Sequence, residues 1–359
     1  MEKYIKEIIL IFFVLGAIDY SLNNRFGIGE KFNEGIISAG RLLMCMAGFI
    51  ILAPSLAYFV RPVVVPIFRG IGADPSLIAG ILLANDSGGA VLAMALADSK
   101  EAGIFNGLIV GATLGTTLMF TFTVILMYTT EKERYSAFCG VMIGIITVPV
   151  ACLAGGYVAG FSAKMIWLNT LPVLAISLIL LLGLCLFREK TLYFINLFAL
   201  FIRLGSLFGL VCGGIRYLTG IALIPYMSSL EDVFPIVGGI AVFLAGAFPM
   251  VAIIARLLKT SFARVCRVLK IKEESIVGLL LGLANGIAVF TYMHDMDDKG
   301  RLLVCAVMVS ASCIVGDHLA YTAQTAPEYI WAVFVGKAAG GASALLLAIF
   351  LMPKIYKEQ

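Results

Sequence analysis

Apolar residues in this chain gather in long unbroken runs, and most polar residues fall between those runs. An α-helix of about 20 residues covers the hydrocarbon core of a bilayer, which is ~30 Å thick. Barrel strands would instead alternate apolar and polar positions. The pattern predicts an all-α polytopic membrane protein with about 11 transmembrane helices, at residues 5–22, 35–60, 76–97, 104–128, 135–161, 165–187, 191–218, 234–257, 275–293, 301–323 and 329–352.

The third run contains the polar stretch 83–89, with the sequence LANDSGG. Asp86 falls near half depth of the bilayer, where a carboxylate is costly and by default marks a functional site. Gly88 and Gly89 weaken the helix and allow other backbone to approach closely. We therefore expect an interrupted helix that presents Asp86 to a solute. In the alternative interpretation, Asp86 caps a helix break and serves assembly only.

Composition supports a location in the membrane. Of the 359 residues, 61% are hydrophobic and only 13% are charged, and the mean hydropathy is +1.03. Soluble domains contain about 25% charged residues. The net charge of +4 is modest and gives no indication of a nucleic-acid partner.

Basic residues predict the orientation of the chain. Segment 259–272 contains five Lys or Arg residues and should lie in the cytoplasm. Counting back through single spans places the N-terminus in the cytoplasm as well. Counting forward places the C-terminus outside, although it carries Lys354 and Lys357. This conflict is evidence against eleven simple spans, and a re-entrant run would remove it.

A weak internal repeat appears at an offset of about 200 residues. Segment 71–85 resembles segment 271–285, and the sequence DSK at 98–100 resembles DDK at 297–299. Ala, Leu and Gly also recur by chance in membrane proteins, so the likeness alone does not establish duplication. We expect a single transport domain over 1–359, with a first pseudo-repeat at 1–161, a connecting helix at 162–190 and a second pseudo-repeat at 191–359. Simple span counting makes the repeats parallel, and a re-entrant run would invert them.

The repeat pairs the interrupted helix around Asp86 with a second one around Asn285. Transporters often place their substrate at the midplane, where such helices meet. Polar and aromatic residues near these breaks are therefore the expected substrate-binding residues: Asp86, Asn85, Ser87, Asn285, Phe290, Tyr292, Thr116, Asp317 and His318. Glycines beside them are expected to act as hinges or close-approach positions: Gly88, Gly89, Gly286 and Gly316.

Each of these predictions has a structural alternative. A threonine such as Thr116 often bonds the preceding turn of its own helix. Asp317 and His318 could form a satisfied pair near the rim of the membrane instead of binding a cation or a proton. Segment 294–298 is expected to be a solvated loop, and Asp19 and Lys337 could pair across helices.

The motifs of soluble enzymes and ATP-driven pumps are missing from the sequence. It contains no G-x-x-x-x-G-K-[ST], H-E-x-x-H or G-x-S-x-G pattern. Its eight cysteines form no C-x-x-C, so neither a metal site nor a disulfide framework is indicated. An intramembrane aspartyl protease would need two facing aspartates, which Asp86 and Asp317 could imitate. We expect no enzyme activity, no metal and no cofactor.

At these motifs the chain resembles the ethanolamine transporter family of bacterial ethanolamine-utilisation pathways, nearly from end to end. The motifs that carry the resemblance are GADPS at 72–76, LLAxDxGG at 82–89, GAFPM at 246–250, LAN at 283–285, MDxxG at 296–300, GDHL at 316–319 and VGK at 335–337. The resemblance implies a multi-pass protein of the bacterial inner membrane that moves ethanolamine into the cytoplasm for catabolism.

The candidate residues suit that substrate chemically. A small alkyl amine with a pKa near that of lysine is protonated at pH 7. Asp86 would supply its counter-charge, Asn85 and Asn285 neutral hydrogen bonds, and Phe120, Phe290 or Tyr292 cation–π attraction. We expect facilitated diffusion by alternating access. The alternatives are a proton-coupled transporter of another small polar solute, of the choline or nucleoside type, and a channel for amine or ammonium. A homo-oligomer stays possible.

Overall fold

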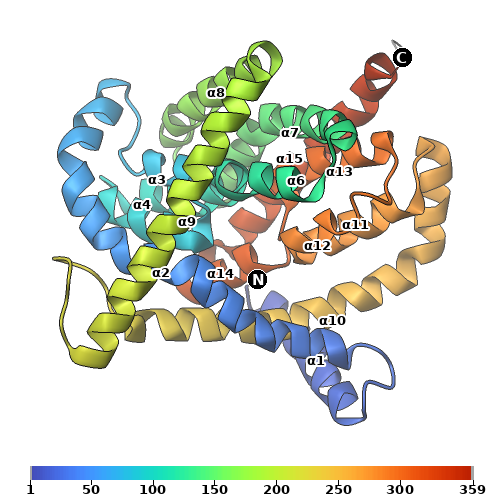
Figure 1. The fold of residues 1–359 in the computed structure, drawn as a ribbon, viewed down its shortest axis with the longest axis horizontal. Coiled ribbons are helices and arrows are strands. Elements are labelled where there is room, and N and C mark those ends of the chain that lie inside the picture. Colours follow the sequence, from blue (N-terminus) through green and yellow to red (C-terminus); the bar gives the residue numbers. More distant parts are fainter. Residues whose placement is uncertain (1, 357–359) are drawn as a thin grey trace.

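The structure is a computed structural model that describes residues 2–356, apart from the side chains at 2, 259–263 and 287. Within that part the chain is helical and has no β-strand (Figure 1). The helices of the first half are α1 (Glu2–Ser21), α2 (Gly29–Gly70), α3 (Leu77–Leu82), α4 (Ala90–Leu96), α5 (Lys100–Ile104), α6 (Phe122–Tyr128), α7 (Glu131–Val158) and α8 (Ala163–Leu186). Those of the second half are α9 (Arg188–Thr219), α10 (Leu230–Leu269), α11 (Glu273–Ala284), α12 (Gly286–Phe290), α13 (Asp298–Ala311), α14 (Asp317–Thr325) and α15 (Ile330–Ile355).

Seven helical segments are long and apolar enough to cross a membrane, judged by length and composition alone. They are Gly29–Gly70, Lys100–Tyr128, Glu131–Val158, Ala163–Leu186, Arg188–Thr219, Leu230–Leu258 and Pro327–Ile355. The all-α polytopic fold is confirmed, whereas the number of eleven spans is not. Residues 259–269, expected in a loop, continue α10. The side chain of Lys259, one of the five basic residues, lies outside the described residues.

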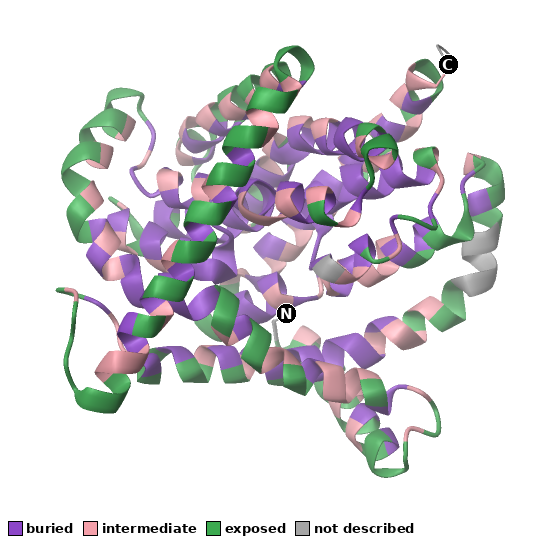
Figure 2. Cartoon of the chain, in the orientation of Figure 1, coloured by how far each residue is buried: buried purple, intermediate pink, exposed green. Residues whose placement is uncertain are grey.

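The core lies between α7, α13 and α15, and α8 and α9 form an outer layer (Figure 2). Large apolar side chains of that outer layer are exposed, among them Ile179 on α8 and Phe201 on α9. In water such a surface would be costly, because each Å² of apolar area exposed costs about 25 cal/mol. Lipid tails remove that cost. These two helices therefore fit a position at the lipid boundary.

Helices α3 and α4 form a re-entrant hairpin. Chain residues 24 positions apart in sequence meet at its base, where the Asp98 N–H donates to the Asp74 carboxylate at 3.1 Å. The Arg69 guanidinium donates to the Asp98 carboxylate at 2.6 and 2.9 Å, and it holds the pKa of that carboxyl below its ordinary value. The run at 76–97 therefore enters the protein and returns to the same end.

Helices α11 and α12 form a second hairpin of the same kind. The Lys272 N–H donates to the Asp297 carboxylate at 2.9 Å, and its ammonium donates to the Asp295 carbonyl at 3.2 Å. The tip of this hairpin is Asn285, whose extended backbone ends α11. The two hairpins lie on opposite flanks of the molecule in Figure 1. The interrupted helices expected around Asp86 and Asn285 are thus present, but as hairpins instead of spans.

Two crossing segments run antiparallel beside these hairpins. The first comprises α5, two π-helical stretches (Phe105–Gly115 and Thr117–Thr121) and α6, and the second comprises α13 and α14 with a break at 312–316. Lys100, at the start of the first, lies 3.7 Å from Glu328, just beyond the end of the second. Arg301, at the start of the second, lies 3.5 Å from Glu133, just beyond the end of the first. Each start therefore faces the other segment's end.

Candidate substrate site

A cavity of about 440 Å³ lies where the tips of the two hairpins meet the broken crossing segments. Its mouth is bordered by α2 and α9, which contribute Cys45 and Arg203 among others. Six residues expected to bind substrate line this cavity: Asp86, Ser87, Thr116, Asn285, Asp317 and His318. The cavity thus brings together side chains that come from four separate segments of the chain.

Asp86 reaches the cavity because the chain turns sharply at the tip of the first hairpin. Ser87 (φ −91°, ψ 41°) and Gly88 (φ 87°) leave helical geometry directly after it. Only glycine adopts such a positive φ at no steric cost, and a Cβ on Gly88 would lie 2.5 Å from the Cβ of Phe49. Asp86 is 5% exposed, and the Ser87 hydroxyl donates to its carboxylate at 3.1 Å.

Asp317 enters the same cavity from the opposite segment. It is the first residue of α14, and its carboxylate accepts a hydrogen bond from the His318 N–H at 3.0 Å. The partial positive charge at a helix N-terminus stabilises an anion there. Asp86 and Asp317 therefore place two acidic groups in one buried space, which makes the site attractive to cations.

His318 links this acidic site to a buried lysine. Its Nε2 lies 3.3 Å from the Thr116 hydroxyl, and its Nδ1 lies 3.0 Å from Nζ of Lys337. Nζ of Lys337 also donates to the Ala112 carbonyl at 2.6 Å. A lysine ammonium can only donate, so Nδ1 accepts and the imidazole proton lies on Nε2. This assignment of the tautomer follows from the hydrogen-bond network.

One group of residues in the described chain has the spacing of metal ligands, namely Cys313, Asp317 and His318, whose candidate atoms lie within 4.8 Å of one another. Both imidazole nitrogens of His318 already have partners in Thr116 and Lys337. Binding a metal through His318 would break one of those contacts.

Three of the expected binding residues do not line the cavity. Asn85 is fully buried behind it, where its amide donates to the His318 carbonyl at 3.2 Å. Phe290 is buried in the core, and Tyr292 packs against the core. The aromatic rings that line the cavity are those of Phe120 and Phe248. Phe120 was one of the three rings expected to offer cation–π attraction, and it lies in a π-helical segment.

The expected glycines occupy close contacts. Gly286 lines the cavity, and its N–H lies 3.1 Å from the Cys313 sulfur. Gly316 packs on the Ala284 carbonyl so tightly that a Cβ would clash. Gly89 likewise lies against the backbone of Ala84, within the tip of its own hairpin.

The expected partnership between Asp19 and Lys337 is wrong. The Asp19 carboxylate accepts hydrogen bonds from the backbone N–H groups of Phe26, Ile28 and Gly29, at 2.7 to 2.8 Å. It closes the turn between α1 and α2. Lys337 instead lies beside His318. Sequence alone could not separate these roles, because both residues are charged groups inside predicted spans.

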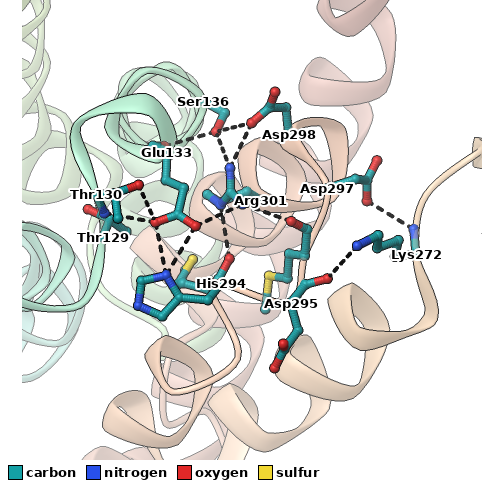
Figure 3. A network of polar contacts seen from close by, with 12 residues as sticks. Thr129, Thr130, Glu133, Ser136, Lys272, His294, Asp295, Asp297, Asp298 and Arg301 are labelled. Atoms are coloured by element: carbon teal, nitrogen blue, oxygen red, sulfur yellow. Dashed lines mark hydrogen bonds and ion pairs between the residues drawn. The ribbon is translucent and has the colours of Figure 1, made fainter.

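The segment expected to be a solvated loop is a turn in which His294, Asp295 and Asp298 are exposed, and it contacts the buried Arg301 in the network of Figure 3. Arg301 is 4% exposed and donates to Asp298 at 2.7 Å and to the Met296 carbonyl at 2.7 Å. Glu133 contacts Arg301 at 3.5 Å and His294 at 3.1 Å. This network fastens the base of the second hairpin to α7. A buried arginine inside a predicted span was the signal available in the sequence.

Comparisons with known proteins give one consistent family. The family described as "Ethanolamine utilisation protein, EutH" matches residues 1–351. A "Probable ethanolamine permease EutH" of Listeria monocytogenes is 40% identical over 358 residues, covering 100% of this chain and 96% of that protein. The "Uncharacterized protein YxeR" of Bacillus subtilis is 36% identical over 96% of this chain and 94% of its own length. A "Probable ethanolamine permease EutH" of Escherichia coli is 33% identical over 99% of this chain and 96% of its own length. No solved structure matches the chain.

Proposed function

We propose, on the premise that this chain belongs to the ethanolamine utilisation protein EutH family, that it is a permease importing protonated ethanolamine across the bacterial inner membrane. The observation that carries the proposal is the single cavity into which Asp86 and Asp317 both project. The relatives from Listeria and Escherichia are named for the same solute. The alternative solutes and mechanisms are tested by the uptake experiment below.

The cavity chemistry fits ethanolammonium at both ends of the molecule. A charge-assisted hydrogen bond to a carboxylate contributes about 1.5–3 kcal/mol, and Asp86 and Asp317 offer two such acceptors. The substrate hydroxyl needs a neutral partner, and Ser87, Thr116 and Asn285 line the same space. The cavity walls are otherwise largely apolar, which strengthens the electrostatic attraction by lowering the local dielectric.

The chain is proposed to consist of two repeats of opposite orientation, 1–161 and 191–359, joined by the helix at 162–190. Two ion pairs support this arrangement. Each joins an acidic residue near the start of the last long helix of one repeat, α7 or α15, to a basic residue of the other repeat. Glu133 with Arg301 corresponds to Glu328 with Lys100. In an inverted pair of repeats such contacts occur twice, at opposite ends of the molecule.

Close backbone contacts repeat in the same way. Gly115 packs on the Leu83 carbonyl, and Gly316 packs on the Ala284 carbonyl. The offset is 316 − 115 = 201 for the glycines and 284 − 83 = 201 for the carbonyls. Each contact joins a hairpin to the crossing segment that follows it. A chance recurrence of small residues would not preserve the contact partner as well as the residue type.

Alternating access is the mechanism we assign to these repeats. The two ion pairs differ in exposure, since the Arg301 and Glu133 side chains are 5% and 14% exposed and those of Lys100 and Glu328 are 69% and 52% exposed. One end of the molecule is thus clamped more tightly than the other. If the tightly held end and the loosely held end exchanged, the central site would be exposed alternately to either side of the membrane.

Uptake of labelled ethanolamine into proteoliposomes tests the proposal. We expect saturable uptake that choline and ammonium compete for weakly, and that a pH gradient does not drive above equilibrium. Accumulation driven by the pH gradient would establish proton coupling instead. Strong competition by choline or a nucleoside would assign another solute, and non-saturable conductance would indicate a channel. Absence of ethanolamine uptake by folded protein would overturn the proposed function.

A further inference from the structure

Lys337 is the buried charge that the proposed transport cycle leaves unexplained. It lies in the middle of α15, is 1% exposed and belongs to the largest fully buried side chains. Its two hydrogen-bonding partners are the Ala112 carbonyl and the imidazole of His318, and neither is a carboxylate. Isolated burial of an ammonium is costly unless nearby charges compensate it. The compensating charges must therefore lie slightly farther away.

The carboxylates of the cavity provide that compensation. Asp317 precedes His318 directly, and its carboxylate lies within 4.8 Å of the imidazole that contacts Lys337, while Asp86 lines the same cavity. This cluster thus contains two carboxylates that line the cavity and one ammonium that is buried in the protein beside them. With all three groups ionised, the cluster carries one net negative charge. Of the other charged residues that line the cavity, Arg41 and Arg203 are exposed and Glu34 is half-buried, so solvent screens their charges.

We propose that Lys337 is a specificity-determining residue that fixes the charge of the empty site at minus one, so that the site accepts one monovalent organic ammonium and discriminates against diammonium solutes. The inference rests on the proposed function. One ethanolammonium brings the buried cluster to neutrality, whereas a diamine of similar size leaves an uncompensated positive charge. An unpaired charge in a low-dielectric site is strongly unfavourable.

The rigid position of Lys337 is what makes this selection effective. Its contact with Ala112 ties α15 to the π-helical segment at Phe105–Gly115, and its contact with His318 ties it to α14. The ammonium cannot move into the cavity without giving up both contacts. It therefore repels a second positive group on the solute without occupying the binding space itself.

Calorimetry on the purified full-length chain tests the inference, with ethanolamine and 1,3-diaminopropane as the two ligands. In the wild type we expect ethanolamine to bind at least about tenfold more tightly, a difference of ~1.4 kcal/mol. Lys337→Met makes the site doubly negative and should reduce or reverse this preference. Lys337→Arg retains the charge and should retain the preference. Lys354→Met removes an exposed charge on the same helix and should change neither affinity.

A charge-compensated pair of variants keeps the test decisive if Lys337→Met does not fold. Asp317→Asn alone makes the site neutral and should lose most ethanolamine binding. Asp317→Asn combined with Lys337→Met restores a charge of minus one and should regain ethanolamine binding and its preference over the diamine. An unchanged preference in Lys337→Met, or a double variant no better than Asp317→Asn, would overturn the role of Lys337. Failure of the wild type to bind ethanolamine would instead overturn the proposed function.

Discussion

Asp86 and Asp317 are 231 positions apart in sequence, since 317 − 86 = 231, yet they line one cavity. Asp86 lies at the break between α3 and α4, and Asp317 is the first residue of α14. At such breaks, backbone groups are free to bind and a side chain can point along the segment instead of outward. The position of Asp86 in the middle of an apolar run identified it from the sequence. The link from His318 to Lys337 could not be predicted, because it depends on the packing of α14 against α15.

Asp86→Asn should weaken ethanolamine binding about 10- to 100-fold, because a lost charge-assisted hydrogen bond costs about 1.5–3 kcal/mol. Asn285→Ala should weaken it less, since only a neutral group is removed. Calorimetry on folded protein measures both. Asp295→Asn is the matched control, because Asp295 is exposed at the base of the second hairpin. Binding of Asp86→Asn within about twofold of the wild type would remove Asp86 from the counter-ion role.

Cys45 offers an independent readout of occupancy. It borders the mouth of the cavity on α2 and is exposed there. Ethanolamine should slow the alkylation of Cys45 by a maleimide in proportion to the occupied fraction of the site, because the reagent enters by the same mouth. Cys185 on α8 is exposed but does not line the cavity, and its labelling should be unaffected. Equal protection of both cysteines would indicate a global change and not occupancy.

At the scale of elements, the sequence predicted the positions of the helices better than it predicted which of them cross the membrane. Hydropathy located the runs at 76–97 and 275–293 but could not distinguish spans from hairpins, because both are apolar and of similar length. The distinction depends on contacts at their bases, such as Asp74 with Asp98. The repeat in sequence and the conflict in the charge count pointed to a re-entrant run. Two such hairpins are present.

The clamp between Arg301 and Glu133 should matter far more for stability than the one between Lys100 and Glu328. Removing one partner of a buried ion pair costs about 3–5 kcal/mol, whereas an exposed pair contributes under about 1 kcal/mol. Thermal unfolding in detergent should therefore show a large loss of stability for Arg301→Met and a small one for Lys100→Met. Similar losses in the two variants would contradict the unequal clamping of the two ends.

At the scale of the whole molecule, the hairpins change the topology derived from basic residues. Because neither hairpin crosses, α13–α14 and α15 return the chain to the side on which α10 ends. If segment 259–272 is cytoplasmic, the C-terminus with Lys354 and Lys357 is cytoplasmic too. Counting back past the first hairpin then places the start of α2 in the cytoplasm, and a crossing by α1, which is not among the seven candidate spans, places the N-terminus outside. The earlier expectation of a cytoplasmic N-terminus assumed that the run at 76–97 crosses the membrane.

Reporter fusions test this topology directly. A reporter in segment 264–272 and one at the C-terminus should both read cytoplasmic, because clustered basic residues resist translocation. A reporter at the N-terminus should read periplasmic. A cytoplasmic reading at both termini would mean that α1 does not cross the membrane, and it would leave the orientation of the two hairpins unchanged.

The antiparallel relation between the two crossing segments also has an energetic consequence. If the two proposed repeats are inverted copies of one design, the inward- and outward-facing states differ only through sequence divergence, and a gap of about 1.4 kcal/mol already shifts their populations tenfold. A carrier that works by the proposed facilitated diffusion has no preferred direction of its own. Its net flow would come from removal of the solute inside the cell. Vesicles preloaded with unlabelled ethanolamine should therefore show transient counterflow of label, with the same peak whichever way the protein is inserted.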